Sequence, residues 1–224
     1  MKKKLVVGFW LAVLLIMILV ITNILTKKIS LVADSTCAFP CWNNVKLGET
    51  SKAELLKILA NVSSIDQSSV FSQKQSYYKF DDVVFFSTGK DWTGYFYRNR
   101  AEAWLISDKV VEIGFSGDAG ITLMQAIQKL GTPDHVYAFT QTERSSINVR
   151  IFFKEQGVVV GFPLNSVESE IVPDQNINSL DLVDKNLYQQ ILESGQFTNG
   201  VLNYDRAILW SGYGKIKDKY WPPK

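Results

Sequence analysis

The chain has 224 residues, of which 24 are basic, 22 are acidic and one is histidine. Five lysines flank the first apolar segment, so residues 29–224 carry 19 basic side chains against 22 acidic ones. This balance excludes the concentrated basic surface that a nucleic-acid-binding protein needs. A body of this length is large enough for one large domain or two small ones.

The first apolar segment, Leu5–Leu25, contains no charged residue and lies between Lys2–Lys4 and Lys27–Lys28. A helix of this length measures about 30 Å, the thickness of the hydrocarbon core of a bilayer. We therefore expect a single-pass membrane protein whose partner along this segment is the lipid bilayer. More lysines precede the segment than follow it, which places the N-terminus in the cytoplasm and the body outside it. The alternative is a signal peptide cleaved after Ala33 or Ala38, which would release a secreted protein.

Two cysteines, Cys37 and Cys41, follow the apolar segment and are the only cysteines in the chain. Outside the cytoplasm, a pair so close in sequence is most simply a disulfide. A thiol–disulfide redox role is the alternative. The pair is separated by three residues, whereas the thioredoxin-type motif has two.

Two helix starts carry the same local signal. Ser51 with Glu54, and Thr122 with Gln125, form capping boxes ahead of apolar stripes, and Gly131 is a good C-cap for the second helix. The first helix is expected over residues 51–60. Strands are expected after each helix, at residues 77–80, 83–87, 94–98, 101–106 and 110–115, and then at 136–139, 147–153 and 157–162.

The repeated order of helix and strands predicts an internal duplication. The expected fold class is α+β, with an N-terminal transmembrane helix followed by a tandem helix-on-antiparallel-sheet body. Residues 63–72 are expected to form a loop that merges into an irregular strand, residues 164–181 a loop, and residues 182–193 a helix. The expected domains are the cytoplasmic tip and anchor (1–28), the juxtamembrane cysteine segment (29–46), the first repeat (47–118), and the second repeat with a C-terminal helix and tail (119–224).

Eleven aromatic residues fall between Phe71 and Trp104. Aromatic residues favour strands, so a sheet core is one interpretation and an aromatic binding face is the other. Within residues 98–105, alanine and leucine alternate with larger polar side chains, which predicts one packed and one more polar face. Val111, Ile113 and Phe115 are expected to share one register of side chains. The candidate binding-face residues are Phe96, Arg98, Arg100, Trp104, Trp210 and Tyr213, the last two with packing against the body as the alternative.

No stretch identifies a catalytic set, a metal site or a cofactor. His135 is the one histidine, so a triad that needs a second histidine is excluded. Asp81 and Asp82 precede a strand and are interpreted as turn residues. The run from Gly114 to Gly120 lacks the residues of a phosphate loop or a nucleophile elbow and predicts a strand-to-helix turn.

Two resemblances add to this interpretation. The Cys-x-x-Pro-Cys-Trp sequence at residues 37–42, with Gly48, Thr50 and the Gly-Tyr-Gly tail, resembles the start of a set of uncharacterised bacterial exported or membrane-anchored proteins. Residues 120–162 resemble lipoproteins of the SmpA/OmlA type, and the tandem arrangement is similar to β-lactamase inhibitor protein. These likenesses imply helices on one face of a sheet and imply no activity.

The first functional hypothesis is a membrane-tethered, extracytoplasmic module that binds another envelope protein or a cell-surface polymer, or supports envelope assembly. It rests on the anchor, the duplicated body, and aromatic residues without a catalytic set. The alternatives are a thiol–disulfide protein that uses Cys37 and Cys41, and a hydrolase whose residues the sequence does not reveal.

Overall fold

The computed structural model describes residues 41–75, 80–88, 100–117, 119–140, 146–188 and 207–221. All of them belong to one compact unit, Leu31–Lys224. Most of the described chain is antiparallel sheet.

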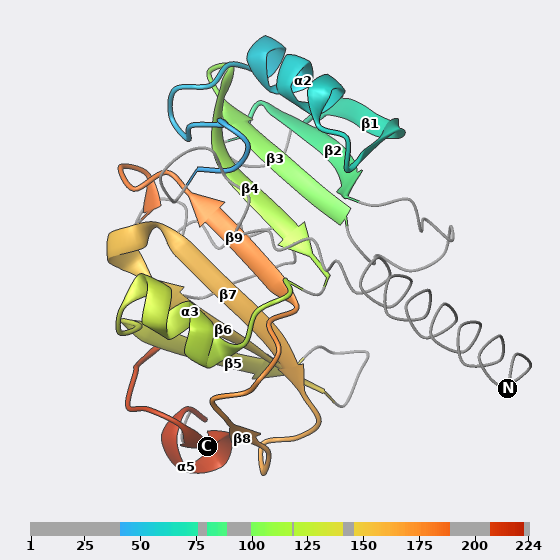
Figure 1. The fold of residues 1–224 in the computed structure, drawn as a ribbon. Helices are drawn as coiled ribbons and strands as arrows, with labels where there is room; N and C mark the ends of the chain where they lie inside the picture. Colours follow the sequence, from blue (N-terminus) through green and yellow to red (C-terminus); the bar gives the residue numbers. More distant parts are fainter. Residues whose placement is uncertain are drawn as a thin grey trace, which may run out of the picture. The chain divides into compact units, whose positions relative to one another are not determined.

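Nine strands form the main sheet of the described residues (Figure 1). In spatial order they are β1 (Ile65–Lys74), β2 (Asp82–Thr88), β3 (Arg100–Ile106), β4 (Lys109–Ser116), β9 (Ser179–Val183), β7 (Val158–Leu164), β6 (Ile147–Phe153), β5 (His135–Thr140) and β10 (Ile208–Leu209). All neighbouring strands are antiparallel. A separate pair joins β8 (Glu170–Ile171) to β11 (Gly214–Lys215).

The helices are α2 (Lys52–Asn61), α3 (Leu123–Leu130) and the short α5 (Ile216–Lys219), and η1 (Lys154–Gln156) is a 3-10 turn. Helix α2 precedes the meander β1–β4, and α3 precedes β5–β7, so the order of helix and meander occurs twice. Strand β9 pairs with β4 on one side and with β7 on the other, and so joins the two meanders into one sheet. The expected boundary between the repeats is therefore not a boundary between sheets.

The expected N-terminal transmembrane helix is not supported, and the fold-class and signal-anchor predictions are corrected on this point. A helix that crosses a bilayer needs about 20 apolar residues. Across the described ranges, no helix is long and apolar enough to cross a membrane, and α2 has only 10 residues. Leu5–Leu25, on which the prediction was based, lies outside the described residues.

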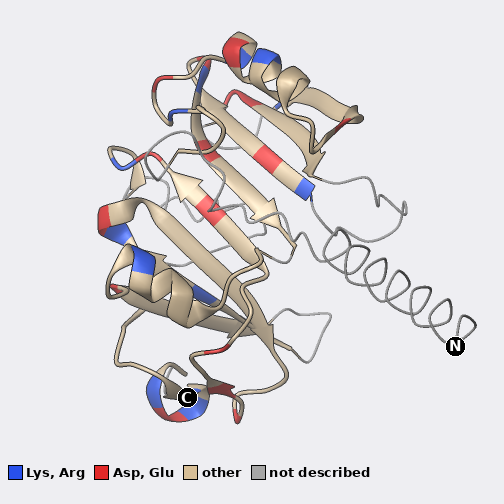
Figure 2. Ribbon diagram, viewed as in Figure 1, with Lys and Arg blue, Asp and Glu red and all other residues tan. Residues whose placement is uncertain are grey.

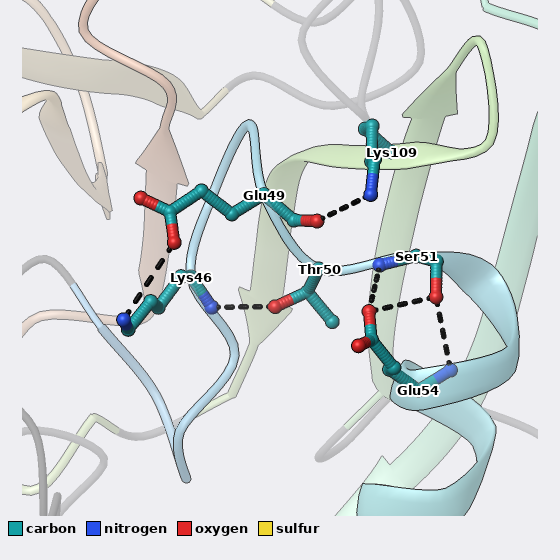
Figure 3. Close-up of polar contacts among 6 residues, drawn as sticks. All are labelled: Lys46, Glu49, Thr50, Ser51, Glu54 and Lys109. Carbon is teal, nitrogen blue, oxygen red and sulfur yellow. Dashed lines mark hydrogen bonds and ion pairs between the residues drawn. The ribbon is translucent and has the colours of Figure 1, made fainter.

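Both predicted capping boxes are confirmed. The backbone N–H of Ser51 donates to Glu54 Oε2 at 2.7 Å, and the Glu54 N–H donates to Ser51 Oγ at 3.3 Å (Figure 3). The Thr122 N–H donates to Gln125 Oε1 at 2.9 Å, with the reciprocal bond at 3.4 Å. Each box satisfies amide groups that a helix start would otherwise leave without a partner.

The segment before α2 is fixed by contacts to its own backbone and to β4 (Figure 3). The N–H of Lys46 donates to Thr50 Oγ1 at 2.8 Å, and its Nζ lies 3.6 Å from Glu49 Oε2. Lys109, at the start of β4, donates through Nζ to the carbonyl oxygen of Glu49 at 2.7 Å. These bonds hold the start of α2 against the β3–β4 turn.

The face of the sheet that α2 and α3 cover carries the larger apolar core, and we call it the apolar face (Figure 1). Leu55 and Leu59 of α2 are fully buried, as is Leu123 of α3. On the sheet itself, the ring of Trp42 stacks on Phe86 at 5.4 Å and meets Phe115 edge-on at 5.3 Å. Burial of these aromatic side chains provides much of the driving force for folding.

Several expected elements differ from the structure. Residues 65–74 form the edge strand β1, so less of the segment is loop than expected, and its register shifts between Asp66 and Phe71 as an irregular strand does. Residues 170–171 and 179–183 form the strands β8 and β9, so the loop expected over residues 164–181 and the start of the helix expected from Leu182 are wrong there. A register shift in the β3–β4 pair turns Val111 away from Ile113, so these two residues do not share a face. A bulge adds one residue to a strand and reverses its alternation locally.

Candidate functional site

The sheet face opposite the helices carries charged and polar side chains near its centre, and we call it the polar face. Figure 2 shows acidic positions inside β3, β4 and β9. These side chains alternate along their strands with residues of the apolar face. The members of the polar face are Arg100, Glu102, Trp104, Glu112, Ser116, Arg150, Ser179 and Asp181. A smaller apolar cluster lies on the same side, and its members include Val111, Phe152, Val159, Val183 and Tyr188.

Strand register brings residues that are distant in sequence into rows across the polar face. One row runs through the paired residues Arg100, Ser116, Ser179, Gly161 and Arg150. The next runs through Glu102, Gly114 and Asp181. Directly paired residues on one face of an antiparallel sheet have neighbouring side chains. The strand order β3-β4-β9-β7-β6 is therefore what assembles the site.

Arg150 on β6 crosses β7 to reach β9. Its Nη1 donates to Ser179 Oγ and lies 3.5 Å from Asp181 Oδ2, with the two charged side chains 9% and 3% exposed. Gly161 makes this path available. A Cβ at position 161 would lie 2.5 Å from Arg150 Nη1 and 2.5 Å from Ser179 Oγ. The glycine is thus required by close approach of a side chain rather than by backbone conformation.

Arg100 holds a second ion pair and an aromatic column at the β1 side of the face. Its Nε lies 3.0 Å from Glu102 Oε1, and its Cζ lies 4.4 Å from the ring centre of Phe85. Phe85 stacks in turn on Phe71 at 4.8 Å. Phe85 is buried, whereas Phe71 is 55% exposed. The column therefore presents an aromatic ring to solvent at one end and holds a charged group at the other.

Glu112 lies opposite Trp104 and is fully buried. Neither of its carboxyl oxygens has a hydrogen-bond partner among the described residues. Burial, together with the neighbouring charges of Asp181 and Glu102, raises the pKa of Glu112 well above its usual range, against the opposing effect of Arg150. An acidic side chain in this setting is stable as the neutral acid.

Glu102 is less deeply placed, with 15% of its side chain exposed. Burial raises the pKa of Glu102 to about 7, and the adjacent Arg100 guanidinium opposes that rise. The charge of the polar face consequently changes near neutral pH.

Four of the six predicted binding-face residues lie in the described ranges, and they lie in two different places. Arg100 and Trp104 lie on the polar face, as the alternation along β3 predicted. Phe96 and Arg98 lie outside the described residues. Trp210 and Tyr213 instead pack against the apolar core near the C-terminus.

The contacts of the C-terminal aromatic residues agree with the packing interpretation. Trp210 stacks on Tyr220 at 5.8 Å and meets Tyr213 edge-on at 5.7 Å. The N–H of Ser211 donates to the Tyr220 hydroxyl at 3.0 Å. This cluster holds the tail in place beside α5.

The remaining candidates have structural roles. Cys41 is disulfide-bonded and 8% exposed, and its expected partner Cys37 lies outside the described residues. Asp81 accepts a hydrogen bond from the Ser107 N–H at 2.5 Å, and Asp82 pairs with Lys52 at 3.2 Å. The described ranges hold no group of three or more His, Cys, Asp or Glu side chains that could bind a metal ion.

Sequence reasoning missed Glu112, Arg150 and Asp181, although a local signal marks each of them. Every one is a charged residue between two apolar residues inside a strand. Such a position predicts a charge held within a packed sheet, because the strand's other positions are buried.

Comparisons with protein-family models, with curated proteins and with solved structures gave no match. The resemblances to SmpA/OmlA-type lipoproteins and to β-lactamase inhibitor protein therefore stay predictions.

Proposed function

We propose that this chain is a non-catalytic binding module that holds a partner protein on the polar face of its sheet. The observation that carries the proposal is the column of Arg100, Phe85 and Phe71, which ends in an exposed ring. Arginine and aromatic side chains are enriched where proteins bind one another, and a few of them supply most of the binding energy. Phe71 is the expected anchor of the interface.

The rigidity of the column supports this assignment. Phe85 is packed between Phe71 and the Arg100 guanidinium, and Arg100 is also held by Glu102. A side chain that is already ordered loses little conformational entropy when a partner covers it. The rim of the polar face is therefore ordered before a partner binds.

A thiol–disulfide function has weaker support. Exchange requires a thiolate to attack one sulfur of a disulfide, so its rate depends on access. Cys41 is 8% exposed, beside the buried Trp42. We interpret its disulfide as a structural link at the start of the folded unit.

Site-specific photocrosslinking tests the binding proposal. A photoreactive phenylalanine analogue replaces Phe71 in one variant and Leu56 in the control, because Leu56 is 37% exposed on α2, on the opposite side of the sheet. We expect one defined adduct from position 71 and none from position 56. Adducts of equal yield from both positions, or none from position 71, would contradict the proposal.

Once the partner is identified, Phe71→Ala is expected to raise the dissociation constant of the complex about 30-fold. This is the effect of losing about 2 kcal/mol at an anchor residue. The variant should fold normally, because Phe71 is more than half exposed. Leu56→Ala is the matched control and should bind like the unmodified chain.

A further inference from the structure

The described side chains of the polar face include more carboxyl groups than arginines. Arg100 pairs with Glu102, and Arg150 pairs with Asp181. Glu112 is a third carboxyl group, with no ion pair or hydrogen bond among the described residues. It is also fully buried. A polar group that is buried without such a partner needs a physical explanation.

The described strands around Glu112 supply both signs of charge. β3 contributes Arg100 and Glu102, β9 contributes Asp181, and β6 contributes Arg150. The other titratable groups of the same side are His135, Tyr137 and Tyr188. The two arginines are already engaged by the other two carboxylates, so no described cation remains for Glu112 alone.

Three occupants could satisfy this carboxyl group: a metal ion, a cation from outside or a proton. The described residues provide no cluster suited to a metal ion. Glu112 has no exposed surface through which an external cation could reach it. Protonation requires neither a metal-binding cluster nor an exposed surface. It also removes the negative charge of Glu112, which is what makes burial of this side chain unfavourable.

We propose that Glu112 is a proton-binding site inside the sheet, occupied in the folded protein, and that loss of its proton loosens the polar face. The site lies between the two ion pairs, next to β9, the strand that joins the two meanders. A negative charge there would repel Asp181 and Glu102 across adjacent strands. The proposal does not depend on which partner, if any, the polar face binds.

The direction of the pH effect follows from the raised pKa of Glu112 in the folded state. The folded protein holds this proton more tightly than the unfolded chain does. The resulting stabilisation is fully present below the ordinary pKa of 4.5 and is lost as pH rises through the folded value. Across that window, one linked proton changes the unfolding equilibrium constant by up to about tenfold per pH unit.

The test uses the full chain and the isosteric variant Glu112→Gln. Unfolding constants are measured with denaturant from about pH 4 to about pH 9, the range over which a raised carboxyl pKa acts. We expect the unfolding constant of the unmodified chain to rise with pH and that of Glu112→Gln to rise less, because the raised pKa of Glu102 still contributes to the slope. Glu49→Gln, at an exposed carboxyl group, is the control and should keep the full slope. An unchanged slope in Glu112→Gln would overturn the proposal.

A second measurement does not use Glu112→Gln and remains decisive if that variant does not fold. Glutamate labelled with ¹³C at the side-chain carboxyl is incorporated, and each resonance is titrated by NMR. We expect two glutamates to titrate well above the ordinary range, of which Glu102→Gln removes the one near pH 7. If no glutamate titrates above the ordinary range once Glu102 is removed, Glu112 is ionised when buried and the proposal is wrong.

Discussion

The two faces of the sheet differ in the side chains that they bury. The apolar face buries aromatic and aliphatic side chains under α2 and α3, and its central residues are almost wholly inaccessible. The polar face places two ion pairs and a lone carboxyl group on the same strands. Burial of apolar area provides stability in proportion to area, whereas buried ion pairs add little net stability and mainly fix geometry. We infer that the apolar face stabilises the fold and that the polar face is available for function.

The largest expected effect tests the role of the apolar face. Phe86→Ala should lower the free energy of unfolding by about 3–5 kcal/mol, because it removes a buried ring that packs against both Trp42 and Phe115 and leaves a cavity. Phe71→Ala, on the other face, should cost no more than about 1 kcal/mol. Denaturant unfolding measures both. Equal losses would remove the distinction between the faces.

The next effect lies within the polar face. Gly161→Ala should destabilise the protein by about 1–3 kcal/mol, because the added Cβ meets the Arg150 guanidinium and Ser179. If this loss of stability arises from the contact with Arg150, Gly161→Ala should be less destabilising when Arg150 is replaced by methionine. A double-mutant cycle should then give a coupling energy of at least about 1 kcal/mol. Additive effects of the two substitutions would show that Gly161 acts on the backbone instead.

The features that were predicted correctly from the sequence depend on residues close together in the chain. Both helix starts were predicted because each capping box lies within four residues of chain. The alternation of Ala101, Ala103 and Leu105 likewise predicted which side of β3 is packed. Signals of this kind are local, so they do not depend on strand order.

Features that depend on strands far apart in sequence were not predicted. Residues 179–183 become a strand because they lie between β4 and β7, and no local signal specifies those neighbours. The pairing of Arg150 with Asp181 requires the order β9-β7-β6 and the glycine at position 161. The sequence marks these charges as buried but does not show that they meet.

The smallest effects concern the helices that cover the apolar face. Ser51→Ala and Thr122→Ala should each lower the free energy of unfolding by about 1 kcal/mol, because each removes the side chain that accepts from the helix N3 amide. The two sites belong to different helices that contact different ends of the sheet, so the double variant should lose the sum, within about 0.5 kcal/mol.

Substitution to glycine separates capping from other effects at the same positions. Ser51→Gly should cost only a few tenths of a kcal/mol, because glycine is tolerated at an N-cap where alanine is not. A loss from either alanine variant as large as that of Phe86→Ala would mean that helix capping, and not burial of side chains under α2 and α3, determines the stability of the apolar face. The expected ranking places burial first because most helical stability in a folded protein comes from packing of the apolar stripe.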